Sequence, residues 1–413
     1  MNIFKKQFHR TTAVAAIFVL LLCVGVIAGC TKTDTNNINT EFTAEELLAD
    51  YDKLWEMLEE DYIYFPILES RRVNIEALRE STRQRLIDRV TDFDSFYYLL
   101  NDMFYRMEYF AHLSIVTPEQ LDVYREYYTE GSGWQKTFQN PQTEAIYEYL
   151  KSKSDKSFTD TNADTNGYRE VEASYDAQRK AVTFVITSFD SAVLERDKDF
   201  IINYLSTLGD AEIDHIIFDI SGNAGGNDLY WQNNIVAPFG GIYEWTNYLY
   251  LRDTELTRSC FFSDFVPKPI SEIKDHQLPD FVQELGLTHF IKNNNRLAGV
   301  GDDAILGDNA LSEKRWVIID ARVYSSADSF SAFCKATGWA TLVGQTTLGD
   351  GQGTSPVMIS LPNTGLLVRF SALAAETPNG TLNAVTGTDP DIPVASSVSS
   401  RDTVNELIDK DIH

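Results

Sequence analysis

The feature that most constrains the fold is a set of short apolar runs in the second half of the chain. Three segments, 215–220, 315–320 and 340–344, contain continuous apolar runs, as in strands buried on both faces. The segment 326–337, between the last two, carries apolar residues at helical spacing. Strands that alternate with helices predict an α/β fold with parallel strands. We place this core at 171–395.

Two further segments near the C-terminus have recognisable patterns, and one large segment does not. Residues 357–361 and 366–373 predict a β-hairpin around the sequence Pro-Asn-Thr-Gly. Residues 396–413 follow the core, and we expect a C-terminal tail helix there. Residues 240–310 form an aromatic-rich insertion in the core, to which the sequence pattern assigns no structure.

The first half of the chain predicts helices. Thr43 opens a capping-box-like pattern, and the apolar residues after it recur at helical spacing. A second stretch, 92–110, is dense in aromatic residues, which indicates core packing. We therefore expect an N-terminal helical domain at 43–112. A variable connecting region at 113–170 follows and ends in a polar loop.

The N-terminus predicts export. Residues 1–29 carry three positive charges and then an apolar stretch that is too short to span a bilayer comfortably, which is typical of a signal peptide. An aliphatic residue and two small ones precede Cys30, a pattern that resembles the lipobox of bacterial lipoproteins. This resemblance implies lipid on Cys30, a tether at 30–42 and an extracytoplasmic position in the cell envelope, anchored to a membrane. The alternative is an ordinary cleaved signal with an incidental cysteine.

Charge and cysteine content exclude several classes of partner and site. Removal of the signal takes three positive charges and no negative ones, so the formal charge of −26 becomes about −29. This charge argues against nucleic acid as a partner. The mature chain keeps only Cys260 and Cys334 besides Cys30, which is no disulfide framework. No Cys/His cluster has metal-ligand spacing, so the sequence predicts no metal and no cofactor.

Four segments carry residues suited to chemistry. Ser325 and Ser326 stand where an apolar strand meets a helix, a place at which a hydroxyl is exposed and backbone N–H groups can stabilise an anion. Gly225 and Gly226 lie in a loop after another strand, where a backbone without side chains can approach a ligand. The other two segments are 344–353 and 377–394. Each segment alone is as well explained by a turn, a loop or a helix cap.

In this order and spacing, the four segments resemble the core of the C-terminal processing (tail-specific) peptidase family, over residues of about 172 to 395. That family also includes tricorn-type proteases and interphotoreceptor retinoid-binding proteins. The resemblance implies a β/α superhelix of the Clp-protease/crotonase type behind an N-terminal helical domain. It also implies a serine peptidase that cleaves peptides or unfolded proteins.

The resemblance assigns roles residue by residue. Ser325 matches the nucleophile, and the backbone N–H groups of Ser326 and of Gly225 or Gly226 match the oxyanion donors. Asp328 matches an acidic residue that orders the helix start. Many processing peptidases carry a PDZ module after the helical region, and residues 113–170 show no such signature.

The chain departs from the family pattern at the general base. Processing peptidases use a lysine where this chain has Asp350, and an aspartate is short and of opposite charge. The tricorn-like branch takes its base from a histidine at the end of the helical region, and His112 lies there. A third group should orient that histidine, and Glu376 is the nearest glutamate before the final motif.

Two hypotheses from different classes therefore remain. The first is a lipid-anchored serine peptidase in which His112 activates Ser325. The second is a catalytically inactive homologue that binds a small apolar ligand or a peptide, which would fit the missing lysine and the aromatic insertion. The distance between Ser325 and His112 distinguishes them.

Overall fold

The structure is a computed structural model, and it describes residues 40–127, 137–138, 140–157, 170–209, 211–262, 265–274, 276–299 and 314–412. The expected signal peptide and Cys30 lie outside the described residues. All described residues belong to one compact unit, 39–413. Within them, no helix has both the length and the apolar character needed to cross a bilayer.

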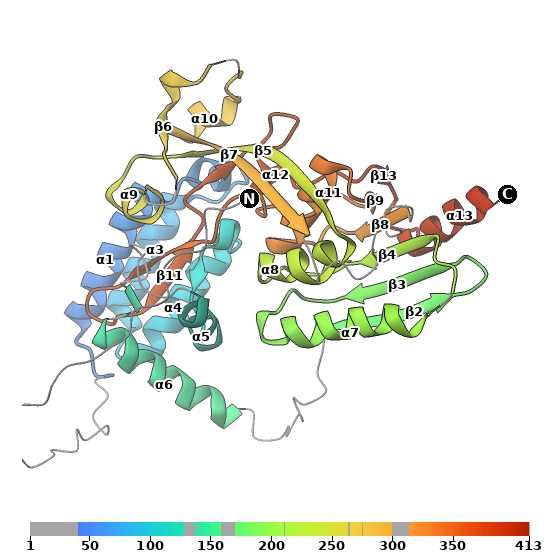
Figure 1. Ribbon diagram of the computed structural model, residues 1–413. Helices are drawn as coiled ribbons and strands as arrows, with labels where there is room; N and C mark the ends of the chain where they lie inside the picture. The colour runs from blue at the N-terminus through green and yellow to red at the C-terminus, as the bar shows by residue number, and fades with distance from the viewer. Residues whose placement is uncertain are drawn as a thin grey trace, which may run out of the picture. The chain divides into compact units, whose positions relative to one another are not determined.

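The N-terminal region is helical, as the sequence pattern predicts (Figure 1). Thr43 caps the first helix: its hydroxyl accepts from the Glu46 N–H at 3.2 Å, and the Glu46 carboxylate accepts from the Thr43 N–H at 2.8 Å. Apolar side chains on the inner faces are buried together with the strands of the hairpin described next. The helices of this region are α1 (Ala44–Asp61), α2 (Phe65–Ser70), α3 (Ile75–Arg89) and α4 (Phe93–Arg106). Two more helices, α5 (Pro118–Tyr127) and α6 (Pro141–Ser157), lie in the segment 113–170, for which the sequence predicts only a variable connecting region.

A small antiparallel sheet packs against these helices. Its strand order is β1-β11-β10, and β10 and β11 form the hairpin predicted around Pro362. β1 follows the short 3-10 turn η1 (Phe110–His112) and pairs with β11, which ties the end of the helical region to a segment more than 250 residues later. The strands are β1 (Ser114–Ile115), β10 (Val357–Ser360) and β11 (Leu367–Phe370).

The central sheet confirms the predicted α/β fold. Its six strands have the order β13-β9-β8-β4-β3-β2, and all neighbours pair in parallel except β2 and β3. The strands β4, β8 and β9 are largely buried, as their continuous apolar runs predict. The strand β3 is almost fully buried as well. Cys334 lies in the same core and is buried. The elements are β2 (Val171–Asp176), β3 (Ala181–Ile186), α7 (Leu194–Thr207), β4 (His215–Asp219), β8 (Lys314–Ile319), α11 (Ser326–Thr337), β9 (Thr341–Gly344), β13 (Ile392–Pro393) and α13 (Ser400–Ile412).

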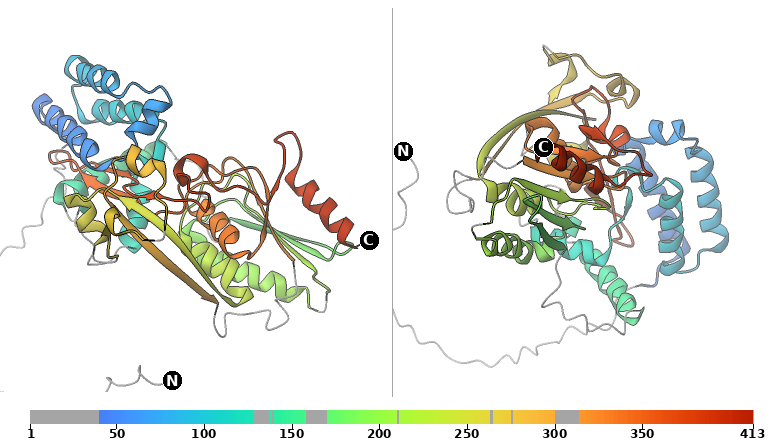
Figure 2. Two further views of the ribbon diagram at one scale, coloured as in Figure 1. Left: turned by 90° about the horizontal axis from the view of Figure 1, so that it is seen from above. Right: turned by 90° about the vertical axis from the view of Figure 1, so that its right-hand side faces the viewer.

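The insertion, for which the sequence assigned no structure, forms a long antiparallel ribbon. β5 and β7 pair along their whole length, and the sheet order is β12-β5-β7-β6. One end of the ribbon is buried with the N-terminal helices, and the other packs on the core of the central sheet. Figures 1 and 2 show it running between these two regions. The elements of the insertion are β5 (Gly241–Leu251), α9 (Glu255–Phe261), β6 (Lys268–Pro269), α10 (Asp280–Glu284) and β7 (His289–Gly299). Later in the chain come β12 (Ala374–Ala375), which pairs with β5, and α12 (Asn383–Thr386).

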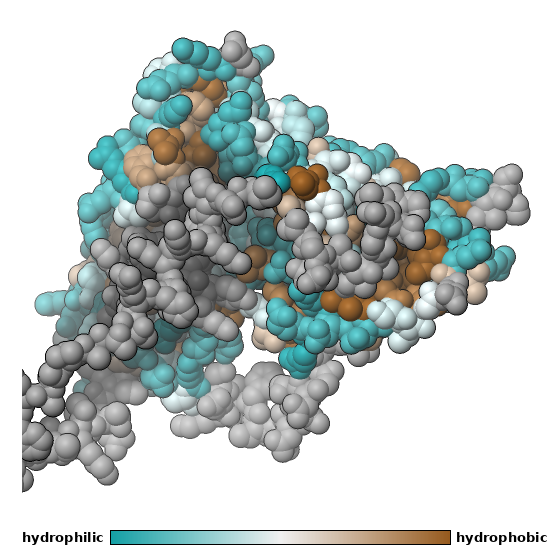
Figure 3. Space-filling model, in the orientation of Figure 1, coloured by the Kyte–Doolittle hydropathy of each residue, from teal (hydrophilic) through white to brown (hydrophobic). Residues whose placement is uncertain are grey.

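Short turns complete the described elements, and the surface is largely polar. On the face seen in Figure 3, hydrophilic side chains cover most of the described surface, and the apolar ones form small patches. This distribution agrees with the acidic composition. The remaining turns are η4 (Ser191–Val193), α8 (Asp228–Tyr230), η5 (Trp231–Val236), η6 (Ala237–Phe239) and η7 (Ile270–Glu272).

Candidate active site

Ser325 stands on a strained turn between β8 and α11. Its backbone has φ 54° and ψ −127°, a conformation that residues other than glycine rarely adopt. Among the described residues, eight that are not glycine have positive φ, and Ser325, His112 and Asp350 are three of them. Such strain gathers at functional sites, where the surrounding fold holds it in place. These three side chains, far apart in the sequence, meet in space.

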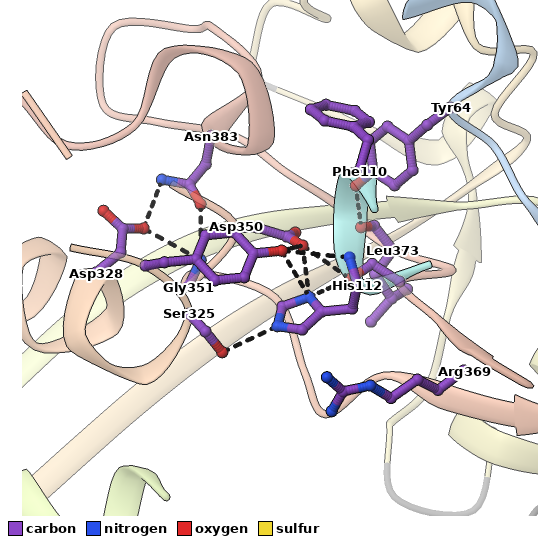
Figure 4. Close-up of polar contacts among 12 residues, drawn as sticks. Tyr64, Phe110, His112, Ser325, Asp328, Asp350, Gly351, Arg369, Leu373 and Asn383 are labelled. Atoms are coloured by element: carbon purple, nitrogen blue, oxygen red, sulfur yellow. Dashed lines mark hydrogen bonds and ion pairs between the residues drawn. The ribbon is translucent and has the colours of Figure 1, made fainter. Parts of the chain in front are cut away.

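The structure brings Ser325 and His112 together (Figure 4). Nε2 of His112 lies 3.0 Å from Oγ of Ser325, within hydrogen-bonding distance. His112 ends η1, directly after the helical region, and its own φ is 61°. The pair therefore has the geometry of a serine and its general base. Their catalytic roles remain predictions.

Asp350, rather than Glu376, contacts the other nitrogen of the histidine. Oδ2 of Asp350 lies 2.6 Å from Nδ1 of His112, and the two side chains are each only 8% exposed. The aspartate that occupies the family's lysine position is therefore no replacement base. It lies where the third member of a serine–histidine–acid triad lies.

The expectation that Glu376 orients His112 is wrong in its geometry. The Glu376 carboxylate accepts from the Tyr250 hydroxyl at 2.6 Å and lies 2.8 Å from Nε2 of His276. These partners belong to the insertion ribbon and the loop beyond it. Sequence proximity to the last motif suggested Glu376, but the antiparallel pairing of β12 with β5 directs the chain there to a different cluster.

Two hydroxyl groups hold the Asp350 carboxylate. The Tyr324 hydroxyl donates to Oδ2 at 3.0 Å, and the Ser371 hydroxyl donates at 3.1 Å. Burial, and then the charge of Asp350, raise the pKa of Tyr324 well above its usual range, so its hydroxyl stays a donor. Tyr324 also accepts from the His112 backbone N–H at 3.2 Å, and its ring lies 4.8 Å from the imidazole. It thus fixes both members of the pair.

Asp328, in the first turn of α11, connects the nucleophile's helix to the loop that carries Asp350. Its buried carboxylate accepts from the Thr347 hydroxyl at 2.5 Å, the Gly351 N–H at 3.1 Å and the Asn383 amide at 3.0 Å. Burial raises the pKa of Asp328 above its ordinary value. Asp328 therefore positions the residue next to Asp350 and does not touch the serine hydroxyl.

The glycine loop packs directly against the nucleophile. A Cβ on Gly225 would lie 2.9 Å from Cβ of Ser325 and 2.9 Å from the Ser326 nitrogen. The Gly225 N–H already donates to Asn223 at 2.8 Å. Within the described part of the chain, the main-chain N–H groups of Gly226 and Ser326 donate to no main-chain acceptor. Of the expected oxyanion donors, these two are the ones left to bind a ligand.

A large cavity with both polar and apolar lining residues adjoins the site without covering it. It measures about 830 Å³ and is bounded by the β5–β7 ribbon, α11 and the segment after β12. It reaches the site at Gly351 and Gln352, next to Asp350. Among the residues that the structure describes, no group of three or more histidine, cysteine or acidic side chains is placed to hold a metal ion.

Comparison with protein families agrees with this geometry. The family model described as Peptidase family S41 matches residues 181–394, which is over half of the chain. The chain belongs to peptidase family S41. This confirms the resemblance to processing peptidases, and it identifies the domain as one of a serine peptidase family. No curated protein matches at a significant level.

Several solved structures align with most of this chain. The crystal structure of mature CPAF has 12% identity and a TM-score of 0.51, with 89% of this chain and 96% of that chain covered. A putative peptidase from Parabacteroides merdae has 17% identity and a TM-score of 0.47 over 88% and 93%. A lipoprotein from Streptococcus agalactiae has 12% identity and a TM-score of 0.47, with 89% of this chain and 97% of that chain covered. At these identities the likeness concerns the fold alone.

Proposed function

We propose that this S41 domain is an active serine peptidase that cleaves peptides or unfolded proteins. One observation carries the proposal: a single imidazole lies 3.0 Å from the Ser325 hydroxyl and 2.6 Å from the Asp350 carboxylate. A merely structural histidine has no need of a strained serine on one nitrogen and a buried carboxylate on the other. The family's missing lysine is thus compensated by a histidine–aspartate pair.

The reaction begins with proton transfer to His112. The carboxylate of Asp350 favours the tautomer with a proton on Nδ1, which leaves the lone pair of Nε2 for the Ser325 hydroxyl. As Oγ attacks the carbonyl carbon, its proton passes to Nε2, and Asp350 stabilises the imidazolium. The N–H groups of Gly226 and Ser326 and the N-terminus of α11 then stabilise the negative charge on the tetrahedral oxygen.

The second half of the reaction reverses these transfers. His112 donates its proton to the leaving amine, the carbon–nitrogen bond breaks, and an acyl-enzyme on Ser325 remains. Water then gives a proton to Nε2, attacks the acyl carbon and releases the acid, which restores the serine hydroxyl. The imidazole and the Asp350 side chain are only 8% exposed, a recess that suits an extended chain better than a folded surface.

Labelling with a fluorophosphonate probe tests the proposal. Ser325 should be modified, the Ser325→Ala variant should not, and Ser329→Ala in the next turn of α11 should label like the parent. Hydrolysis of an unfolded protein such as denatured casein should show the same pattern. A native chain that neither labels nor hydrolyses would support the second hypothesis, an inactive homologue that binds an apolar ligand or a peptide.

We further propose that the protein is held to a membrane of the cell envelope by lipid on Cys30. The support is the charged and apolar segment 1–29 and the small residues before the cysteine. Cys30→Ser should leave unprocessed precursor or release the protein from the membrane fraction. A variant that stays membrane-bound at the mature size would contradict the lipid anchor.

A further inference from the structure

The strand β5 has an uncovered edge. Of its 11 residues, only Leu249 and Tyr250 pair with β12. One residue earlier, the Tyr248 carbonyl accepts from the Glu376 N–H at 3.0 Å, so the main chain of Tyr248 faces the β12 side. Main-chain groups of alternate residues face the same edge of an antiparallel strand. The N–H and C=O of Thr246 therefore face that edge too, and they have no main-chain partner on it among the described residues.

This edge opens into the cavity beside the active site. Thr246 and Tyr248 line the cavity from β5, and the chain after β12 turns away between Thr377 and Thr381, which leaves the next strand position unoccupied. Gly351 lines the same cavity. A Cβ on Gly351 would come within 2.2 Å of the Ser325 carbonyl oxygen, so the cavity ends beside the nucleophile's backbone.

The cavity wall offers neutral hydrogen-bonding groups. Asn293 donates to Asn295 at 2.9 Å, Asn295 donates to Asn247 at 2.8 Å, and Asn247 donates to the Gln352 carbonyl at 2.9 Å. This amide chain connects the ribbon to the loop that carries Asp350.

The charged groups on the same wall are engaged within the protein. Glu376 contacts His276 at 2.8 Å, and Lys335 contacts Asp391 at 2.5 Å. The carboxylate of Asp389 accepts from the Thr346 hydroxyl at 2.7 Å. Asp228, which also lines the cavity, accepts from Trp231 at 3.1 Å and from the Ser329 hydroxyl at 3.4 Å. The carboxylates of Asp389 and Asp228 thus have only neutral partners, and a cationic side chain of a ligand could pair with them.

We infer that an extended segment of the substrate polypeptide binds in this cavity as an added strand on the Thr246 edge of β5. The inference rests on the proposed peptidase function and names where its substrate lies. Main-chain hydrogen bonds to the edge give affinity that tolerates many sequences, while the amide groups of the wall suit segments with small polar side chains. The segment occupies the place where β12 would continue, and its end reaches the nucleophile past Gly351.

Peptide binding to the Ser325→Ala chain tests the site without hydrolysis. The probe is a fluorescent, end-blocked octapeptide of alanine, serine and threonine, and binding is followed by anisotropy. In that background, Thr246→Pro removes the N–H that faces the peptide, and proline is tolerated on strand edges. Asn294→Pro is the matched control, because Asn294 lies directly opposite Thr246 and its N–H faces the far edge of the ribbon. Both changes also disturb the Thr246–Asn294 contact.

We expect Thr246→Pro to weaken binding at least tenfold and Asn294→Pro to change it less than threefold. The same peptide, N-methylated at alternate residues, should bind at least tenfold more weakly to the Ser325→Ala chain. This second test requires no substitution in the strand. Equal binding by the two proline variants, equal binding of the methylated peptide, or no binding at millimolar peptide would overturn the inference. Fluorophosphonate labelling is read separately: an unlabelled protein with edge-dependent binding would contradict the peptidase function but keep the site.

Discussion

Two clusters in this molecule place a histidine against a carboxylate that also accepts from a tyrosine hydroxyl. In the first, His112 lies 2.6 Å from Asp350. In the second, His276 lies 2.8 Å from Glu376. The tyrosines are Tyr324 at 3.0 Å and Tyr250 at 2.6 Å from their carboxylates.

The two clusters differ at the free side of the imidazole. His112 presents its second nitrogen to Ser325, on a backbone held in an unfavourable conformation. His276 instead stacks on the Tyr248 ring, with centroids 3.9 Å apart and planes 6° from parallel. A histidine–carboxylate–tyrosine group is thus a general way to fix a ring. What makes the first cluster catalytic in our proposal is the strained hydroxyl on its other side.

The largest expected effect is loss of the nucleophile or its base. Ser325→Ala and His112→Ala should each lower kcat/KM for peptide hydrolysis by about 10³-fold or more, and the double variant should be no worse, because the residues act as one unit. Asp350→Lys combined with His112→Ala should not restore full activity. Steady-state hydrolysis measures all four. Full activity in His112→Ala beside an inactive Ser325→Ala would assign the base to another group.

The variant Asp350→Asn should have the next largest effect, a loss in kcat of about 10²- to 10⁴-fold. An amide can present its N–H to Nδ1 and so stabilise the wrong tautomer, in which Nε2 carries the proton and cannot accept from Ser325. Rates across the pH range, with far-UV circular dichroism as the control for folding, measure the effect. Unchanged kcat would mean that the contact at 2.6 Å is structural only.

Tyr324→Phe should have a smaller effect of about tenfold in kcat, with little change in KM. The variant keeps the aromatic ring beside the imidazole but removes one donor to Asp350 and the acceptor for the His112 N–H. A change confined to KM, or a loss as large as that of Asp350→Asn, would show that Tyr324 acts in another way.

The second cluster should contribute stability and little to the chemistry. Glu376→Gln should slow labelling by the small fluorophosphonate probe less than threefold, while it lowers the free energy of unfolding by about 1 kcal/mol through weaker bonds to Tyr250 and His276. Chemical denaturation and labelling rates test both statements. A hundredfold loss of labelling would assign this cluster to catalysis after all.

A third buried carboxylate, Asp61, has no histidine partner. The pH dependence of stability therefore provides a further test of how these carboxylates differ. Its partner is the Thr254 hydroxyl at 2.5 Å, and burial raises the pKa of Asp61 to about 6. Because the folded state holds this proton more tightly than the unfolded state, the contribution of Asp61 favours folding at low pH. That contribution is lost as pH rises from about 4 to about 6.

Asp61→Asn should therefore raise the unfolding midpoint at pH 7 and reduce its fall between pH 4 and 6. The gain is at most about 3 kcal/mol, the equivalent of the pKa shift. Thermal denaturation over this pH range measures it. An identical pH profile for the two proteins would mean that Asp61 is not buried as a titrating acid.

The sequence predicted most of the regular core and only part of the site. Continuous apolar runs identify β4, β8 and β9 because such strands must be buried on both faces. The ribbon of β5 and β7 was not predicted. Along the chain, β5 passes from exposed to buried and β7 from largely buried to more exposed, so neither strand has a single pattern. Ser325 and His112 were found through motif positions, and the structure places them together.

Asp350 could not be assigned as the histidine's partner from sequence. Its contact with His112 depends on a positive φ at Asp350 and on the Asp328 carboxylate, which binds the next N–H. Both are properties of the folded backbone. Glu376 was chosen for its position near a motif, but the pairing of β12 with β5 turns it toward His276.

The great separation of the catalytic pair along the chain has a consequence for timing. His112 and Ser325 are 213 residues apart, and contacts so distant form only after both surrounding cores have closed. In a chain exported from its N-terminus, as we propose, the histidine emerges well before the serine. A half-translocated polypeptide therefore cannot digest itself or its export apparatus. If the chain is exported and active as we propose, its connectivity alone would keep it latent during secretion.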